Sequence, residues 1–374
     1  MSAASEPLDG HAGGIDGSVA VIGTGLIGTS VALSLRRAGV DVLLSDVDPE
    51  HLAIARAAGA GRELAESDVP AIVVVAVPPR RAAAVLAAAS ERWPDATLTD
   101  VTSVKERVIL EAVGAGADPE RLVGGHPMAG REVSGAAGAR ADLLDDRLWV
   151  VTPLDTSGID HVRRVHRLVA ACGALPVEMG LAEHDAAVAL VSHTPQVLSS
   201  VLAGRLVESD LDHVRIAGQG LRDMTRIAAS NVPMWSDILT ANAGPVANVL
   251  DGVVADLRRT VAALRRLEQQ EEADRGAEAV ARVLSAGVEG QSRIPGKHGA
   301  APSAYREISV IVADRPGELA RLFVAVGDAG VNLEDIRIEH VFGRPSGLVA
   351  LFVRPEAGER LIEALGASGF DVRG

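Results

Sequence analysis

The sequence is poor in cysteine, in clustered positive charge and in long apolar runs. Cys172 is the only cysteine among 374 residues, which excludes an internal disulfide and a zinc site built from several cysteines of one chain, and we expect no metal site. The net charge is −14, and lysine and arginine do not cluster. A nucleic acid or an anionic membrane is therefore not an expected partner, because both require a dense positive surface.

The sequence contains no uninterrupted run of about 18 apolar residues, so we expect no membrane span. Residues 1–16 are acidic and glycine-rich and lack the apolar core of a signal peptide. We interpret them as a disordered leader and expect the protein in the cytoplasm.

Lysine is nearly absent from the chain. Lys105 and Lys297 are the only two lysines among 36 basic residues. A lysine kept in so arginine-rich a chain is either needed as a compact point charge or retained by chance. For Lys105 both explanations stay open, since it lies next to other candidate site residues.

The sequence does contain a strong signal for dinucleotide binding in residues 19–46. An apolar strand runs into a glycine-rich turn, a helix follows, and a second apolar strand ends at Asp46. Such a turn brings backbone close to a pyrophosphate at a helix N-terminus, and a carboxylate about 20 residues on binds the ribose hydroxyls. Because Asp46 would repel the extra phosphate of NADP, we predict NAD as the cofactor. The turn residues expected to contact it are Gly23, Gly25, Leu26, Ile27 and Gly28.

Further short apolar strands alternate with helical or loop segments as far as residue 179. This alternation predicts an α/β fold, a Rossmann-type doubly wound sheet with a largely parallel core, over residues 17–179. Ligands of such sheets bind beyond the carboxyl ends of the strands. We expect Val77 and Pro78 to follow one strand and contact the cofactor, and Ser103 and His126 to follow two others. Gly124 and Gly125 precede His126, and we interpret them as a flexible hinge.

Residues 180–284 predict an all-helical substrate and dimerisation domain. The first helix is apolar almost all round, which implies burial, and Pro195 should kink it beside His193. A later helix carries one apolar stripe with spacings of three and four, which suits a partner helix. A second copy of the chain is the expected partner, with packing inside one chain as the alternative.

The remaining residues predict a linker and a small third domain. Residues 285–304 are rich in Gly, Pro, Ser and Ala, which is typical of a linker. Residues 305–374 predict the order βαββαβ, a ferredoxin-like module.

Several motifs in order resemble those of prephenate dehydrogenases, within the wider family that includes arogenate dehydrogenases. They are "GTGLIG", "TDVTSVKE", "GGHPMAGREVSG", "EHDAAVALVSHTPQ" and "GLRDMTRIAASNVPMWSDI". The resemblance covers roughly residues 18–290. It implies NAD-dependent oxidative decarboxylation of prephenate to 4-hydroxyphenylpyruvate and CO2 in tyrosine biosynthesis. The tail, with "DRPGELARLF" and "GVNLEDI", resembles an ACT domain.

The resemblance also implies roles for single residues. His126, in "GGHPMAG", becomes the general base, a role that suits an imidazole because it titrates near neutral pH. Ser103 becomes a hydrogen-bond partner of the same substrate hydroxyl, although it can also be an ordinary cap of the following helix. His193 is implied in the substrate pocket, with a satisfied core histidine as the alternative. Arg226 is implied to bind the ring carboxylate through its two-pronged guanidinium.

Other positions near the expected pocket complete the prediction. Glu132 and Asp223 are expected to support the substrate-binding cations. Gln196 and Leu221 depart from the family pattern, which often has a second histidine and an aromatic residue there. Both departures leave arogenate dehydrogenase, which would give tyrosine directly, as an alternative activity.

The ACT-like tail predicts regulation by an aromatic amino acid, with tyrosine as the first candidate. Asp314 and Gly317 lie in a turn at a helix N-terminus, where free N–H groups can hold a carboxylate. Asn332 could complete the site from a neighbouring copy. The alternative is a module that only aids assembly.

Two other classes of function compete with this interpretation. A hydroxyacid dehydrogenase of similar layout typically uses a lysine in its helical domain, and this chain has none between Lys105 and Lys297. A non-enzymatic sensor of NAD and an amino acid would not need His126, Ser103 and Arg226 together.

Overall fold

The structure is a computed structural model of the chain, and it describes residues 14–130, 135–269, 272–294, 305–340 and 346–373. It divides into two compact units, Met1–Val253 and Val254–Gly374. The division falls inside the long helix α11 (Ala243–Leu267), so one helix contributes to both units.

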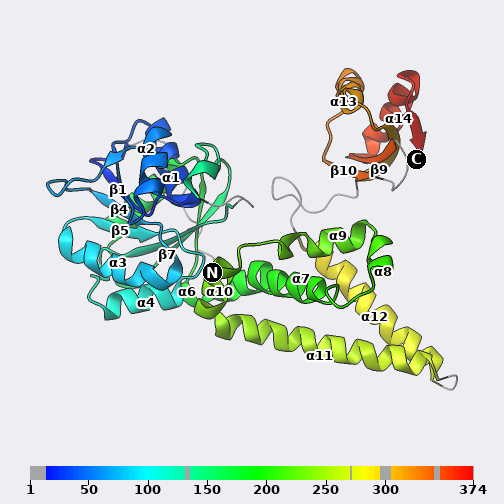
Figure 1. The fold of residues 1–374 in the computed structure, drawn as a ribbon, viewed down its shortest axis with the longest axis horizontal. Helices are drawn as coiled ribbons and strands as arrows, with labels where there is room; N and C mark the ends of the chain where they lie inside the picture. Colours follow the sequence, from blue (N-terminus) through cyan, green and yellow to red (C-terminus); the bar gives the residue numbers. More distant parts are fainter. Residues whose placement is uncertain (1–13, 131–134, 270–271, 295–304, 341–345, 374) are drawn as a thin grey trace, which may run out of the picture. The chain divides into compact units, whose positions relative to one another are not determined.

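A five-stranded parallel sheet forms the centre of the first unit (Figure 1). Its strand order is β3-β2-β1-β4-β5, and every neighbouring pair is parallel. The strands are β1 (Val19–Ile22), β2 (Val42–Ser45), β3 (Arg62–Glu63), β4 (Ile72–Val75) and β5 (Thr97–Asp100). The predicted doubly wound, parallel core is confirmed.

Helices cover both faces of this sheet because its strands are apolar on both sides. Alternate strand residues pack on one face against α1 (Leu26–Arg37), α2 (Pro49–Ala57) and α5 (Ile159–Ala171). The other strand residues pack against α3 (Pro79–Arg92) and α4 (Glu106–Gly114). Near-continuous apolar strands are what a parallel sheet buried on two faces requires.

Three further strands form a second sheet in the order β6-β7-β8. They are β6 (Val123–Pro127), β7 (Leu148–Pro153) and β8 (Leu175–Glu178), and β6 is antiparallel to β7. A parallel bridge between Leu98 and Leu122 joins the chain entering β6 to β5. His126 lies inside β6 and pairs with Val150. The strand continues to Pro127, so the prediction that His126 follows the strand was wrong.

The two glycines before His126 allow close packing and do not form a hinge. A Cβ atom added to Gly125 would lie 2.7 Å from the carbonyl oxygen of Asp100 and 2.8 Å from Nε1 of Trp149. Both distances are shorter than real Cβ contacts. Our hinge interpretation was therefore wrong, because it considered the freedom of glycine and not the space available.

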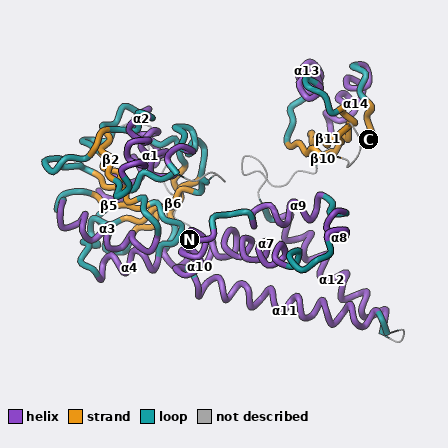
Figure 2. Tube along the Cα trace, viewed as in Figure 1, coloured by secondary structure: helices purple, strands orange, loops and turns teal. Residues whose placement is uncertain are grey.

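The chain after β8 consists of helices and loops as far as α12 (Figure 2). The elements are α6 (Leu181–Val188), the π-helical turn η2 (Ala189–His193), α7 (Thr194–Gly204), α8 (Leu211–Arg215), α9 (Gln219–Thr225), the 3-10 turn η3 (Arg226–Ala228), α10 (Val232–Ala241) and α11. The break expected at Pro195 appears as η2, a widened turn that ends at His193 just before it. Such π-turns are common at functional sites.

The helical segment Leu181–Gly204 is long and apolar enough to span a membrane, and 33% of its most apolar stretch is buried inside the structure. Core helices of soluble proteins can be equally long and apolar, and this segment carries the buried His184, Asp185 and His193. The predicted all-round burial is wrong for the single chain, because Leu190 and Val191 are 60% and 64% exposed.

The helix α12 (Ala273–Ser292) extends farther than the sequence predicted. We placed the start of a linker at residue 285, but the helix continues for eight more residues. Alanine, glutamate and glutamine in this stretch favour a helix, and Pro295 is the first residue that excludes its continuation. Residues 295–304, the rest of the predicted linker, lie outside the described residues.

The tail consists of β9 (Arg306–Ala313), α13 (Glu318–Asp328), β10 (Asp335–His340), β11 (Ser346–Val353), the 3-10 turn η5 (Pro355–Ala357), α14 (Gly358–Ala367) and β12 (Asp371–Arg373). Its four strands form an antiparallel sheet in the order β10-β11-β9-β12. The helices α13 and α14 pack on one face through Leu322, Val326, Leu361 and Leu365. The tail therefore has an apolar core of its own.

Candidate active site

The glycine-rich turn between β1 and α1 leaves no space for side chains at two of its positions. Gly23 has a φ of +101°, and a Cβ there would lie 2.5 Å from the carbonyl oxygen of Ala76. A Cβ on Gly28 would lie 1.9 Å from the carbonyl oxygen of Gly23. Among the residues that the structure describes, no side chain caps the N-terminus of α1, which begins at Leu26. A turn closed this tightly before an uncapped helix fits a pyrophosphate.

Asp46 is anchored to the same turn at the carboxyl end of β2. Its Oδ2 accepts a hydrogen bond of 2.5 Å from the backbone of Thr24 and one of 2.9 Å from the Thr24 hydroxyl. Val77, which follows β4, would lie 3.1 Å from a Cβ on Gly23. Pro78 comes next, at the N-cap position of α3. The expected cofactor residues therefore lie together at one edge of the sheet, and they fit NAD.

A buried ion pair lies beneath β6, the strand that carries His126. Lys105 and Asp100 are both 0% exposed, and the Lys105 ammonium donates to the Asp100 carboxylate. It also donates to the carbonyl oxygen of Gly125, at 2.7 Å. The amide of Gly125 donates back to Asp100 Oδ1 at 3.2 Å. The ion pair thus binds both the N–H and the C=O group of Gly125, the residue immediately before His126.

The charge on Lys105 depends on its partner. Burial lowers the pKa of Lys105 from its usual 10.5, and the Asp100 carboxylate opposes that shift. A buried pair is stable only when further hydrogen bonds satisfy its atoms. Here Thr102 also donates to Asp100 from its backbone, at 3.0 Å, and from its hydroxyl. The geometry thus explains why Lys105 is retained without giving it contact with the reacting atoms.

His126 heads a chain of three polar side chains. Its Nδ1 lies 2.8 Å from Nε2 of His184, and Nδ1 of His184 lies 2.8 Å from Oδ1 of Asp185. The two imidazole rings meet edge to face, with centroids 5.1 Å apart. Asp185 accepts hydrogen bonds from the backbone amides of Lys105 and Glu106, at 2.8 and 3.0 Å. The helical segment and the sheet therefore meet at this carboxylate.

The surroundings of His126 keep it neutral. Burial lowers its pKa well below 6.5, and His184, Lys105 and His193 add smaller shifts in the same direction. A neutral imidazole has one nitrogen with a free lone pair, which is the form a general base needs.

A second histidine is held from the helical side. Nδ1 of His193 lies 3.0 Å from the side-chain amide nitrogen of Asn242. The same nitrogen donates to the backbone carbonyl oxygen of Asp185 at 2.9 Å. Trp235 packs edge to face on the ring, with centroids 6.0 Å apart. Burial lowers the pKa of His193 to about 4, so it too is neutral near pH 7. Asp185 thus contacts both histidine networks, one through its carboxylate and one through its carbonyl.

Ser103 lies between β5 and α4, at the edge that β5 shares with the chain entering β6. It does not cap α4, whose first helical residue is Glu106 and whose N-cap is Lys105. The carboxylate of Asp185 accepts hydrogen bonds from the backbone amides there. The alternative of an ordinary capping role for Ser103 was therefore wrong.

The remaining predicted substrate residues come from the helices. Gln196 is buried in α7, and its amide donates to the hydroxyl of Ser230 at 2.8 Å, which ties α7 to the loop after η3. Arg226 opens η3, which packs on α7. Asp223 accepts a hydrogen bond of 2.8 Å from Gln219. Glu132 lies outside the described residues.

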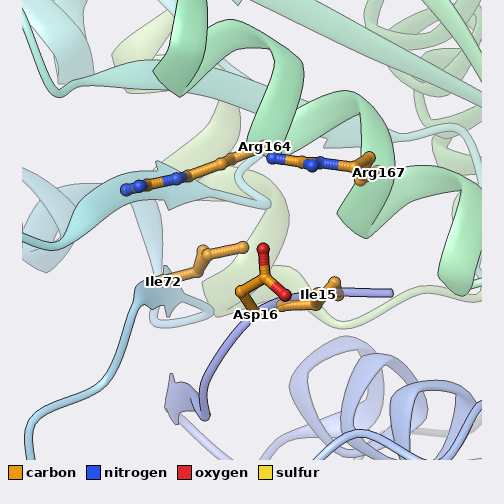
Figure 3. Close-up of a pocket in the computed structure, with 5 residues that line it drawn as sticks. All are labelled: Ile15, Asp16, Ile72, Arg164 and Arg167. Atoms are coloured by element: carbon orange, nitrogen blue, oxygen red, sulfur yellow. The ribbon is translucent and has the colours of Figure 1, made fainter. Parts of the chain in front are cut away.

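A small cavity of about 70 Å³ lies at the opposite edge of the sheet (Figure 3). Arg164 and Arg167 of α5 line one side, and Ile15, Asp16 and Ile72 line the other. Ile72 begins β4, so this is the amino-terminal edge. Because ligands of doubly wound sheets bind at the carboxyl edge, we assign this cavity no part in the site.

Four residues of the site were not predicted as site residues: Asp100, His184, Asp185 and Asn242. The first three lie in motifs that carried the family resemblance, "TDVTSVKE" and "EHDAAVALVSHTPQ". A buried carboxylate next to a histidine in an apolar helix was the available signal. Asn242, at the junction of α10 and α11, offered no signal in the sequence.

Comparisons with known proteins agree on one family. Two family models match the chain, "Prephenate dehydrogenase, nucleotide-binding domain" over residues 31–178 and "Prephenate dehydrogenase, dimerization domain" over residues 181–280. A protein of Streptomyces niveus named "Probable prephenate dehydrogenase" is 36% identical over 350 residues, 92% of this chain and 96% of that protein. The prephenate dehydrogenase of Bacillus subtilis is 28% identical over 333 residues, 86% of this chain and 88% of that protein.

A solved structure has the same fold. The crystal structure of prephenate dehydrogenase from Aquifex aeolicus in complex with hydroxyphenyl propionate and NAD+ superposes with a TM-score of 0.63 at 27% identity. The match covers 72% of this chain and 98% of that chain.

Replacing Lys105 by methionine should destabilise the protein strongly. The change leaves the Asp100 carboxylate buried without its cation, which typically costs about 3–5 kcal/mol. Arg107→Met is the matched control, since it breaks an exposed pair with Glu111 and should cost less than about 1 kcal/mol. Urea unfolding measures both variants. If both unfold at the same urea concentration, the buried pair does not have the structural role assigned to it.

Proposed function

This chain belongs to the prephenate dehydrogenase family, and we propose that it converts prephenate to 4-hydroxyphenylpyruvate and CO2 with reduction of NAD+. The observation that carries the proposal is the hydrogen-bonded chain from His126, on the strand β6 that lies next to β5 of the dinucleotide-binding sheet, through His184 to Asp185. This carboxylate–imidazole chain suits the removal of a hydroxyl proton.

The protein's own residues have three tasks in this reaction. They position the substrate, accept one proton and hold its two carboxylates. NAD+, when bound, supplies the acceptor for the hydride that leaves the ring carbon bearing the hydroxyl. His126 takes the hydroxyl proton at Nε2. CO2 then leaves, and the electrons of its bond to the ring complete the aromatic system as a phenolate. The phenolate oxygen takes the proton back from His126, which gives 4-hydroxyphenylpyruvate and restores the base.

The substrate residues follow from position and chemistry. Ser103 is proposed to hydrogen-bond the same hydroxyl as His126, and His193 to face the ring. Arg226 is proposed to bind the ring carboxylate, with Glu132 and Asp223 supporting the cations. Gln196, joined to Ser230, is proposed to shape the pocket. Arogenate stays the alternative substrate, because the two compounds differ only in a keto group or an ammonium group on the side chain.

NAD is the cofactor that the turn residues fit, and Asp46 is proposed to select it over NADP. Its carboxylate is fixed beside the glycine-rich turn by Thr24, where it would meet the ribose hydroxyls. Assays of NADH and NADPH formation with prephenate and with arogenate test both selectivities. Equal kcat/KM with the two cofactors would contradict the role of Asp46, and no turnover of either substrate would contradict the proposed function.

A homodimer is the proposed assembly. The second matched model is that of a dimerisation domain, and large apolar side chains are exposed on the helices of the single chain. They include Leu190, Val191, Val201, Leu257 and Leu264. An interface between two copies would bury them. We propose the cytoplasm as the place of the reaction.

We also propose that residues 305–374 form an ACT domain that binds an aromatic amino acid, with tyrosine as the first candidate. Gly317 has a φ of +92° and precedes α13, so its backbone can approach a ligand closely. Asp314 is exposed in the same turn, and Asn332 is exposed beyond the end of α13. An assembly role without a ligand is the alternative.

His126→Asn should lower kcat by about 10² to 10⁴ while NAD+ affinity is kept, because a general base contributes that much. His213→Asn, a histidine exposed on α8, is the control and should be unchanged. Steady-state rates and NAD+ titration measure both variants. A His126→Asn enzyme within threefold of wild type would remove His126 from the mechanism.

The pH dependence gives a second measurement on the same residue. Protonated His126 cannot accept a proton, and its pKa is lowered well below 6.5. Activity should therefore persist as pH falls through 6.5 and decline only at lower pH. A decline in kcat/KM centred above pH 6.5 would contradict this.

Millimolar tyrosine should lower the activity of the full chain, and calorimetry should detect its binding. Gly317→Val should weaken the effect, since a β-branched residue is disfavoured at a φ of +92°. Gly366→Ala is the control, because open space surrounds that position in α14. If neither tyrosine, phenylalanine nor tryptophan binds or changes the rate, the regulatory proposal is wrong.

A further inference from the structure

We propose that His184 and Asp185 are positioning residues that fix the tautomer of His126 and thereby decide which of its nitrogens accepts the substrate proton. The proposal rests on the proposed role of His126 as the base. It assigns a task to two buried residues, 0% and 2% exposed, that do not themselves contact the reacting atoms.

The argument starts at Asp185, because an ionised carboxylate can only accept hydrogen bonds. Its Oδ1 accepts from the Lys105 amide and its Oδ2 from the Glu106 amide. These two donors belong to the first turn of α4, where free N–H groups favour a negative charge. The carboxylate is therefore held in one orientation, with its charge stabilised.

The direction of the next hydrogen bond follows from that charge. Nδ1 of His184 lies 2.8 Å from Oδ1 of Asp185, so it must be the nitrogen that carries the proton. In an imidazole with one proton, Nε2 is then an acceptor. Nε2 of His184 lies 2.8 Å from Nδ1 of His126, so Nδ1 of His126 donates. The lone pair of His126 is left on Nε2.

The network on the helical side gives His193 the opposite tautomer. The amide nitrogen of Asn242 is a donor, and its orientation is set by the carbonyl oxygen of Asp185. It therefore donates to Nδ1 of His193, which leaves the proton on Nε2. One residue, Asp185, thus sets one imidazole as a proton acceptor and the other as a hydrogen-bond donor.

The same arrangement offsets part of the cost of placing a positive charge on the His126 ring. Among the described residues, the charged and titratable groups that face His126 are Lys105, His184 and His193, with Asp185 behind His184. The first three lower the pKa of His126 and so oppose that charge. When Nε2 takes the proton, the bond from Nδ1 to His184 becomes charge-assisted, and the Asp185 carboxylate lies one ring farther on.

Two substitutions of His184 separate its hydrogen bonding from its packing. In His184→Gln the amide nitrogen can donate to Asp185 while the oxygen accepts from His126, so the tautomer is kept. His184→Leu fills the space but offers neither bond. Asp185 is left unchanged, because its carboxylate also caps α4 and a variant there could fail to fold.

We expect His184→Leu to lower kcat on the order of 10- to 100-fold, as loss of an orienting partner does, with KM for prephenate within about threefold. His184→Gln should restore kcat to within about threefold of wild type. Equal losses in both variants, or a loss confined to KM, would show a role in packing or substrate binding and overturn the proposal.

Nitrogen NMR of the wild-type protein tests the tautomer without any assay. His126 is assigned by the signal missing in His126→Asn. We expect its proton on Nδ1 near pH 7, and a shift of that proton toward Nε2 in His184→Leu but not in His184→Gln. A proton on Nε2 of His126 in the wild type, or two protons on His184, would overturn the proposal. Correct tautomers in a protein without prephenate turnover would instead overturn only the proposed function.

Discussion

The rest of the site depends on the hydrogen bonds that the Asp185 carboxylate accepts. The carboxylate comes from the helical segment and binds two backbone amides at the start of α4, which follows β5 of the parallel sheet. Its side chain orients His184, and its carbonyl oxygen orients Asn242. A single residue therefore fixes the helical segment against the sheet edge and contacts the hydrogen-bond networks of both His126 and His193. Breaking this contact would displace the proposed base and the proposed substrate-binding helix together.

The second constraint is charge in a buried site. Lys105 contributes a positive charge below β6, and Asp100 neutralises it at direct contact. Burial and the neighbouring cation lower the pKa of His126, and burial lowers that of His193, so both favour the neutral form. This balance explains why a protein so rich in arginine keeps a lysine here: a compact ammonium can donate to one carboxylate and one carbonyl under a strand, where a planar guanidinium would need more space. The glycine before His126 serves the same packing, because a side chain there would collide with Trp149 and the Asp100 backbone.

Much of the architecture could be predicted, because the periodicity of apolar residues determines it. The glycine-rich turn and the place of Asp46 follow from local patterns in residues 19–46, and the parallel sheet follows from the alternation of strands and helices beyond them. Local patterns did not predict that His126 lies inside β6 or that α12 ends at Ser292. Strand pairing and helix ends depend on neighbours that are distant in sequence. The candidate site residues that lie in recognisable motifs could be predicted from the sequence. Those whose role depends on contacts between distant parts of the chain could not. Asp185 and Asn242 are 57 residues apart, and only the fold brings the amide of one to the carbonyl of the other.

The proposed mechanism requires that Nε2 of His126 receives the proton of the substrate hydroxyl while Nδ1 stays bonded to His184. A crystal structure of the protein with NAD+ and 4-hydroxyphenylpyruvate tests this claim directly. We expect the ring hydroxyl oxygen within about 2.6–3.2 Å of His126 Nε2, the range that proton transfer requires, with the contact between His126 and His184 preserved. A hydroxyl bound by another side chain, with His126 Nε2 out of hydrogen-bond reach, would contradict it.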